Sequence, residues 1–92
     1  MSCFVIERSL PDGLSEGEIE AAVRFAITVD SDFPDVSWLG GHLTADQRRF
    51  FCICDAPSAE RVREVARIAE IPCDVVTDVR HMRPADYVEA ML

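Results

Sequence analysis

Two cysteines and a histidine stand at spacings that could bind a soft metal ion. Cys52 and Cys54 lie two residues apart in an apolar run, and His42 lies in the preceding run, after two glycines. Thiolate and imidazole are ligands that suit Zn, Ni and Cu ions. We therefore consider His42, Cys52 and Cys54 as metal ligands, with a Ni or Zn ion as the only expected cofactor. A pair of buried free cysteines in the core is the alternative interpretation.

Three other residues could contribute to a small-molecule site beside His42. Trp38 and Phe50 are large aromatics that a ligand or a partner should cover. Glu7 is a carboxylate in an apolar strand, where a buried acid must be paired or neutralised. We expect Glu7, Trp38, His42 and Phe50 to be ligand-binding residues, and we assign no catalytic residue. The candidate partner for Glu7 is Arg8, Arg80 or His81, and a position at an exposed strand end is the alternative interpretation.

The composition limits the class of protein. The chain has 92 residues, of which 49% are hydrophobic, and this supports one domain with one core. Its net charge of -8 would repel phosphate backbones and anionic lipids, so neither nucleic acid nor a membrane is an expected partner. We find no signal peptide and no apolar run long enough to span a membrane, so we expect a cytoplasmic protein with reduced cysteines.

Alternation, capping signals and turn residues predict the order strand, helix, strand, strand, helix, strand. Ser15 and Glu18 form a capping box at the start of the first helix, and Ser58 is the expected N-cap of the second. The predicted strands cover residues 3–8, 36–44, 48–56 and 75–81, and the helices cover 16–29 and roughly 59–69. Pro84 should begin a short C-terminal tail helix. We expect a single domain over 1–92, with 83–92 as the tail.

This order predicts a ferredoxin-like α+β fold, a four-stranded antiparallel sheet with both helices on one face. Strand alternation then divides the side chains between the two faces. We expect the helices to cover Phe4, Ile6, Leu39, Leu43, Phe51 and Ile53. We expect the opposite face to hold Val5, Glu7, Trp38, Gly40, His42, Phe50, Cys52 and Cys54. A domain this small often covers such a face by forming a homodimer.

Several stretches resemble a family of small bacterial ferredoxin-like proteins typified by a nickel-responsive, nickel-binding member. They are Phe-Val-Ile-Glu-Arg at 4–8, Cys-Ile-Cys-Asp-Ala-Pro at 52–57, Val-Arg-Glu-Val-Ala at 62–66 and Ile-Pro-Cys-Asp at 71–74. The resemblance implies a dimeric α/β barrel, formed by two sheets packed face to face, and metal binding in at least one member.

Site residues match the pattern of this family only in part. Glu7, Trp38 and Cys52 match the usual family residues. Gly40 and Val65 stand where the family has histidines, and His42 stands where an aromatic is usual. His42 and His81 are the imidazoles that could replace the missing ones.

The sequence leaves three functions open. The first is a non-enzymatic protein that binds a metal ion or a small ligand on the helix-free sheet face. The second is a cofactor-free oxygenase or isomerase on a dimeric α/β barrel, with Trp38 and Phe50 as cavity walls and His42 or Glu7 as base. The third is an interaction module without a pocket. We favour the non-enzymatic binding protein.

Overall fold

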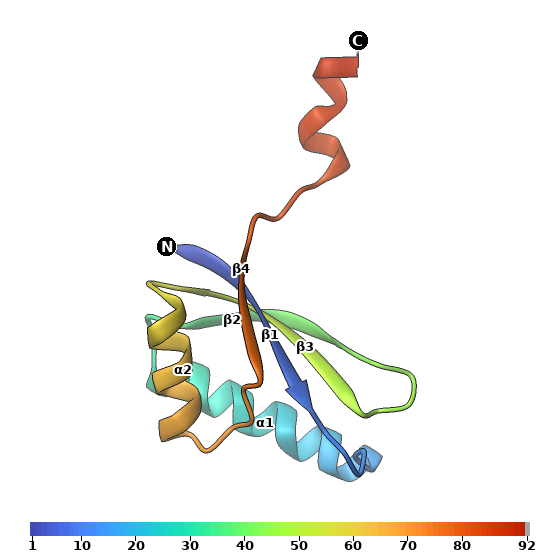
Figure 1. Ribbon diagram of the computed structural model, residues 1–92, viewed down its shortest axis with the longest axis vertical. Coiled ribbons are helices and arrows are strands. Elements are labelled where there is room, and N and C mark those ends of the chain that lie inside the picture. The colour runs from blue at the N-terminus through green and yellow to red at the C-terminus, as the bar shows by residue number, and fades with distance from the viewer. Residues whose placement is uncertain (92) are drawn as a thin grey trace.

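The computed structural model describes residues 1–91, and these form the predicted succession of elements (Figure 1). Leu92, the last residue of the predicted tail, lies outside the described residues. The elements are β1 (Ser2–Ser9), α1 (Glu16–Asp32), β2 (Ser37–Leu43), β3 (Arg49–Ala56), α2 (Ala59–Ile68), β4 (Val75–Val79) and the 3-10 helix η1 (Pro84–Met91).

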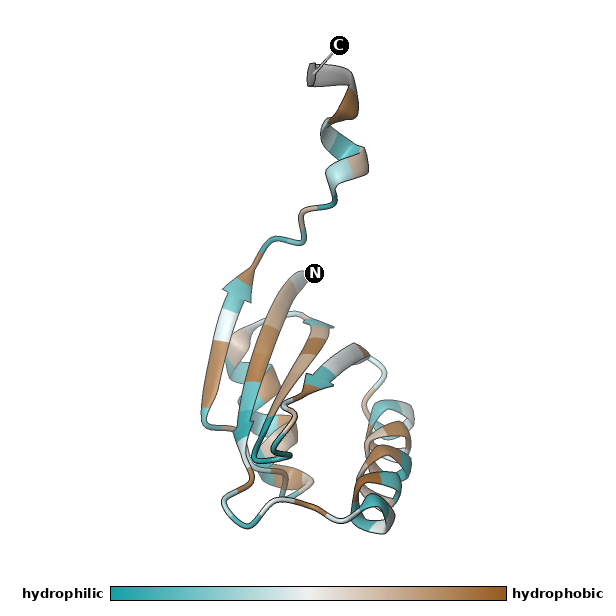
Figure 2. Cartoon of the chain, turned by 90° about the vertical axis from the view of Figure 1, so that its right-hand side faces the viewer, coloured by the Kyte–Doolittle hydropathy of each residue, from teal (hydrophilic) through white to brown (hydrophobic). Residues whose placement is uncertain are grey.

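The four strands form one antiparallel sheet in the order β2-β3-β1-β4. Both helices lie on the same side of this sheet (Figures 1 and 2). The predicted ferredoxin-like α+β fold is therefore confirmed. The two strands at the centre, β1 and β3, also hold most of the buried residues of the core.

Local signals fix where the two helices begin. The Ser15 hydroxyl accepts a hydrogen bond from the Glu18 backbone N–H, and the Glu18 carboxylate accepts one from the Ser15 N–H, which completes the predicted capping box. Ser58 caps α2 by accepting a hydrogen bond from the Arg61 N–H. α1 continues three residues beyond its predicted end at Val29 and stops at Asp32.

The side chains of β3 lie on the opposite faces of the sheet from those predicted. Phe4 and Ile6 of β1 are buried under the helices, as predicted, but they lie directly opposite Cys54 and Cys52 of β3. Opposite residues of an antiparallel pair share a face. The cysteines therefore lie on the helix-covered face. The residues of β3 predicted for that face, Phe51 and Ile53, point the other way.

A β-bulge in β2 also places Trp38 and His42 on opposite faces of the sheet, although the sequence predicted them on the same face. Trp38 of β2 lies opposite Cys54, whereas Gly40 lies opposite Ile53, so the chain gains one residue at Leu39 and the alternation reverses. Trp38 consequently packs against the core, and His42, opposite Phe51, faces away from the helices. The predictions that Trp38, Phe50, Cys52 and Cys54 share a face with His42 and Glu7, and that helices cover Leu39, are wrong.

We call the side of the sheet without helices the helix-free face. On β1 and β3 it presents Val5, Glu7, Phe51 and Ile53. On β2 and β4 it presents His42, Val75, Thr77 and Val79. None of these residues is fully buried within one chain. The larger apolar side chains of β3 thus remain partly exposed to water.

Two glycines make the bulge in β2 possible. Gly40 has φ +143, a conformation that L side chains rarely adopt. A Cβ on Gly41 would lie 2.6 Å from the Phe51 carbonyl oxygen and 3.0 Å from the Phe50 ring. Since the nearest obstacle is backbone of the paired strand, it cannot move aside without disturbing the sheet.

We predict that Gly41→Ala lowers the free energy of unfolding by about 1–3 kcal/mol, the usual cost of forcing extra volume into a packed site. Gly17→Ala is the matched control, because nothing lies within 4 Å of that position in α1. It should raise stability by about 0.5–1 kcal/mol. Urea unfolding of both variants measures the difference. Equal stabilities would show that the strands do not approach as closely as described.

α1 stands apart from the sheet. None of its residues is buried, although its apolar stripe faces the strands, and it packs mainly against the edge strand β2. Figure 2 shows the ribbon of this helix set apart from the strands. α2, in contrast, buries Val62, Val65 and Ala66 against the core. The two helices therefore cover the sheet unequally.

The tail η1 projects away from the rest of the chain (Figures 1 and 2). It raises the radius of gyration to 14.7 Å, compared with about 12 Å expected for a compact chain of this length. Tyr87 and Val88 in the tail are 43% and 49% exposed. Among the described residues, no helix combines the length and apolarity needed to cross a membrane.

Candidate functional site

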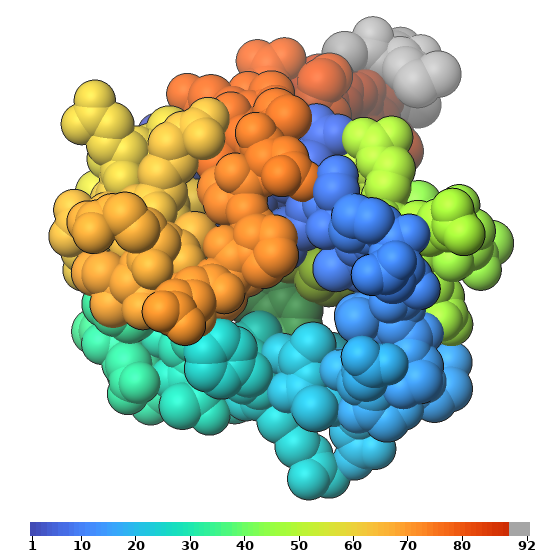
Figure 3. Space-filling view, turned by 60° about the horizontal axis from the view of Figure 1, so that its bottom comes forward, coloured from blue at the N-terminus to red at the C-terminus, as the bar shows by residue number. Residues whose placement is uncertain are grey.

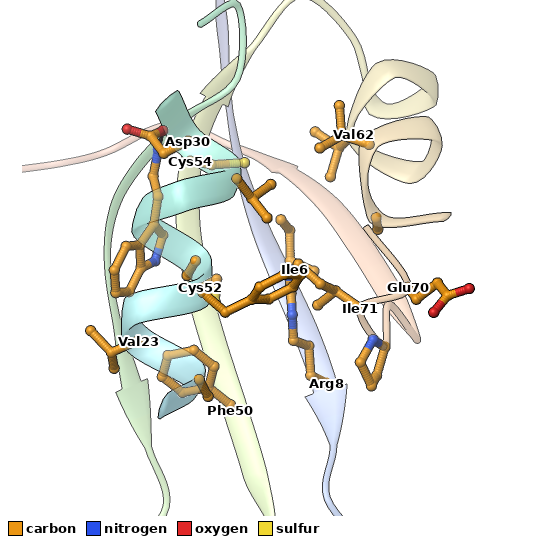
Figure 4. Close-up of a pocket in the computed structure, with 18 of the residues that line it drawn as sticks. Ile6, Arg8, Val23, Asp30, Phe50, Cys52, Cys54, Val62, Glu70 and Ile71 are labelled. Atoms are coloured by element: carbon orange, nitrogen blue, oxygen red, sulfur yellow. Dashed lines mark hydrogen bonds between the residues drawn. The ribbon is translucent and has the colours of Figure 1, made fainter. Parts of the chain in front are cut away.

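A pocket of about 320 Å³ lies between α1, α2 and the helix-covered face of the sheet (Figure 4). Cys52 and Cys54 of β3 form part of its floor, and Trp38 and Phe50 form part of its wall. We call this space the internal pocket. All four of these predicted site residues line it, on the opposite side of the sheet from the predicted site.

Two polar contacts tie the helices to β2 and to the segment that precedes it. The Asp30 carboxylate of α1 accepts a hydrogen bond of 2.8 Å from the Trp38 backbone N–H, which ties the helix to β2. The Arg61 guanidinium of α2 donates two hydrogen bonds to Asp35, of 2.7 and 3.2 Å. The guanidinium beside Asp35 holds the pKa of that carboxyl below its usual value. Both helices are thereby linked to the segment that enters β2.

Two buried donors in the internal pocket have no hydrogen-bond partner. They are Nη1 of Arg8 and Nε1 of Trp38. Burial raises the pKa of the Cys52 thiol, and the Arg8 charge lowers it in part. Arg8 and Trp38 lie on β1 and β2, the two strands that flank the strand carrying Cys52.

The two thiols of β3 lie in surroundings that disfavour their thiolate forms. Burial raises the pKa of Cys54 to about 11, with smaller contributions from Cys3 and Cys52. Metal ions bind thiolate, and a buried neutral thiol must first lose its proton in an apolar environment. The structural interpretation of these cysteines, as small apolar residues of the core, therefore fits their position better.

Glu7 and His42 lie on the helix-free face. Glu7 lies opposite Phe51, and Phe51 lies opposite His42, so the three residues form one row across β1, β3 and β2. The Glu7 carboxylate pairs with Arg49, at 2.6 Å between Oε1 and Nη2. The Arg49 guanidinium also lies 5.1 Å from the centre of the Phe51 ring. Glu7 is thus paired, but with a cation that the sequence did not single out.

The predicted metal ligands do not converge within one chain. The sheet separates His42 from Cys52 and Cys54, which line the internal pocket on its other side. Across residues 1–91, no three His, Cys, Asp or Glu side chains are grouped so that they could hold a metal ion. The donor set of a single protomer therefore does not fit a nickel or zinc site.

The predicted enzyme site does not form within one chain either. That interpretation required Trp38 and Phe50 to enclose the same cavity as a base supplied by His42 or Glu7. Trp38 and Phe50 line the internal pocket, while both candidate bases lie on the helix-free face. The walls and the base are on opposite sides of the sheet.

Sequence reasoning missed Arg8 as a residue of the internal pocket. We considered Arg8 only as a partner for Glu7, which is its neighbour in the chain and points to the other face. The signal was present in β1 itself. Arg8 follows Phe4 and Ile6 at intervals of two, so alternation places it with them under the helices. Arg49, the observed partner of Glu7, was missed as well.

The geometry defines a small ferredoxin-like protein with an internal pocket and an uncovered sheet face. The profile of the nickel responsive protein SCO4226-like family matches residues 4–79, and the chain belongs to this family. The fold is also similar to that in a crystal structure of SCO4226 from Streptomyces coelicolor A3(2), with a TM-score of 0.74 and 20% sequence identity. That similarity covers 89% of this chain and 100% of the other. No curated protein sequence matches the chain.

Proposed function

We propose that the protein is a non-enzymatic, nickel-type metal-binding protein that assembles as a homodimer through the helix-free face. The observation that carries this proposal is the row formed by Glu7, Phe51 and His42 on a partly exposed sheet surface. The name of the family, nickel responsive, supports the choice of metal.

The helix-free face has the composition of a surface between two copies of this chain. Its centre is apolar, with Val5, Phe51 and Ile53 on neighbouring strands. The bulkier side chains of β3 point to this face, and the small cysteines point to the helices. A soluble monomer rarely leaves such a surface uncovered, and a second sheet of the same kind would bury it. Two-fold symmetry makes the surface self-complementary.

The projecting tail is consistent with this assembly. η1 extends beyond its own domain, where Tyr87 and Val88 are exposed to water (Figure 1). Small domains in dimers often use terminal segments to extend the contact with the partner copy. We propose that the tail of each copy packs on the other.

A metal site shared between two copies explains how the chain could bind nickel without a cluster of its own. Imidazole and carboxylate are both suitable ligands for Ni²⁺. One copy supplies His42 and Glu7 from the same face, and a symmetric dimer supplies each of them twice. We propose that His42 is the principal ligand, because the Glu7 carboxylate already pairs with Arg49.

Competition titration with Ni²⁺ and Zn²⁺ tests this function. We predict binding of about one ion per two protomers, as an ion that lies on the two-fold axis between the copies requires. His42→Ala should weaken nickel binding at least about tenfold, since it removes a ligand. The matched control is His81→Ala, which removes an exposed imidazole between β4 and the tail.

Two results would contradict the proposal. Unchanged nickel affinity in His42→Ala would show that His42 is not a ligand, and it would exclude the helix-free face as the metal site. Loss of binding in His81→Ala alone would place the metal at the C-terminal segment instead. The titrations use a buffer without imidazole. Sedimentation analysis with and without nickel then reports whether the metal changes the assembly.

A further inference from the structure

We propose that the internal pocket binds a small apolar molecule that ends in a single carboxylate, with the carboxylate held by Arg8. The indole N–H of Trp38 donates a further hydrogen bond to an acceptor on the ligand. The apolar part of the ligand lies between α1 and the sheet. This site is on the opposite side of the sheet from the proposed metal site and does not depend on it.

The space itself is the first observation. The apolar stripe of α1 faces the sheet across the internal pocket, yet Val23 in this stripe remains 37% exposed. Protein interiors are normally close-packed, and an unfilled apolar cavity costs stability in proportion to its volume. A volume of about 320 Å³ is within the range of small-molecule sites. Figure 3 shows the hollow between α1 and the rest of the molecule.

The unpaired donors are the second observation, and they define the head group. Figure 4 shows Arg8 reaching into the middle of the internal pocket from β1. Its buried Nη1 and the buried Nε1 of Trp38 both lack partners. Arg8 as a whole is half-buried, but an unsatisfied buried N–H is unfavourable, and more so on a charged group. An anionic ligand with hydrogen-bond acceptors removes both costs.

The acidic residues near the internal pocket do not supply that anion. Asp30 accepts the hydrogen bond from the Trp38 backbone, and Asp74 accepts one of 2.5 Å from the Ser9 N–H. Glu70 is exposed at the rim, and Figure 4 shows its carboxylate pointing away from the cavity. Arg8 forms no ion pair with any of the described side chains. The hydrogen bond from the Ser9 N–H, and to a smaller extent the Arg8 charge, lowers the pKa of Asp74, but the two side chains form no ion pair. The Arg8 guanidinium is thus available to an anionic ligand.

The remaining lining decides between classes of anion. Apart from Arg8, the wall and floor are almost entirely apolar, and they include Ile6, Leu43 and Val65. A phosphate ester would bring two negative charges to a site with one cation. A monocarboxylate brings one charge, and its two oxygens match the planar fork of a guanidinium. An aliphatic or aromatic monocarboxylic acid is thus the class that fits.

Fluorescence of Trp38 tests the proposal directly, because this is the only tryptophan of the chain and it lines the internal pocket. Decanoate is the probe, and 1-decanol is the uncharged comparison, both below their aggregation concentrations and without metal. We expect decanoate to shift the Trp38 emission saturably and to bind at least about tenfold more tightly than decanol. Equal binding of the two probes would overturn the role of the carboxylate.

Matched variants separate the head-group site from the cavity. Arg8→Gln should weaken decanoate binding at least about tenfold and leave decanol binding unchanged, because only the charge is removed. Arg48→Gln, which removes an exposed guanidinium outside the internal pocket, should change neither. Loss of decanoate affinity in both variants would indicate a general charge effect and contradict the site.

A second pair of variants tests the cavity without touching Arg8. Ala22 of α1 lines the internal pocket, whereas the adjacent Ala21 does not. Ala22→Phe should fill the space and abolish the decanoate-induced shift, while Ala21→Phe should retain it. If decanoate leaves the emission of the wild-type protein unchanged, α1 closes onto the sheet in solution and no such site exists.

Discussion

Phe51→Asp is expected to convert the proposed homodimer into a monomer. Phe51 lies in the middle of the helix-free face, between Glu7 and His42. A carboxylate at this position would be buried without a partner against the second copy, close to the existing carboxylate of Glu7. Such a group at the centre of an interface costs several kcal/mol, so the dissociation constant of the dimer should rise at least about 100-fold.

The fold itself should tolerate this substitution. Phe51 is only partly buried within one chain and is absent from the core cluster. Sedimentation equilibrium measures the assembly, and circular dichroism checks that each variant is folded. Ile27→Asp is the control, since Ile27 is 57% exposed on α1 and lies outside both the helix-free face and the internal pocket. It should leave the dimer intact.

Other outcomes of this experiment are equally informative. A wild-type protein that sediments as a monomer at all concentrations would contradict the homodimer before any substitution is made. A Phe51→Asp variant that remains dimeric would show that the copies meet elsewhere. Ile53→Asp, which places a carboxylate one row away on the same face, should reproduce the monomer and exclude an effect peculiar to one side chain.

Stability should fall steeply with rising pH between about 9 and 11, and Cys54 should account for much of this loss. Burial raises the pKa of Cys54 from 9.0 to about 11 in the folded chain. Between these values the unfolded chain has released the thiol proton and the folded chain still holds it. Rising pH therefore favours unfolding, by up to about 2–3 kcal/mol for a shift of two units.

Urea unfolding at a series of pH values from 8 to 11 measures this dependence. Cys54→Ala should make the curve flatter, because it removes the titrating group. A smaller slope should persist, since burial also raises the pKa of Cys52. Cys73→Ala, which removes a thiol that is half-buried outside the strands, is the matched control and keeps Cys54. Parallel curves for wild type and Cys54→Ala would show that Cys54 is not responsible.

Local signals were sufficient to predict the elements and their order. The Ser15 capping box and the Ser58 N-cap depend on neighbouring residues, so they hold in any fold that contains these helices. Alternation in β1 correctly placed Phe4 and Ile6 under the helices. The order of elements then restricted the topology to the observed sheet.

The two faces of β3 were decided only by tertiary packing. Phe51 and Ile53 are more apolar than Cys52 and Cys54, and hydrophobicity alone therefore favours the first pair for the core. The small cysteines fit beneath α2, where they pack with Val62, and the larger pair covers the other face. Both sets are apolar enough to be buried, so the strand pattern does not distinguish them.

The separation of His42 from Trp38 was likewise beyond the sequence pattern. The glycines before His42 allow a bulge, but they do not require one. Pairing with β3 introduces the extra residue at Leu39 and reverses the alternation after it. The sequence by itself determined the elements, their caps and the buried face of β1. Only the tertiary structure decided which side chains of β2 and β3 share a surface, because that depends on register and on the volume available beneath the helices.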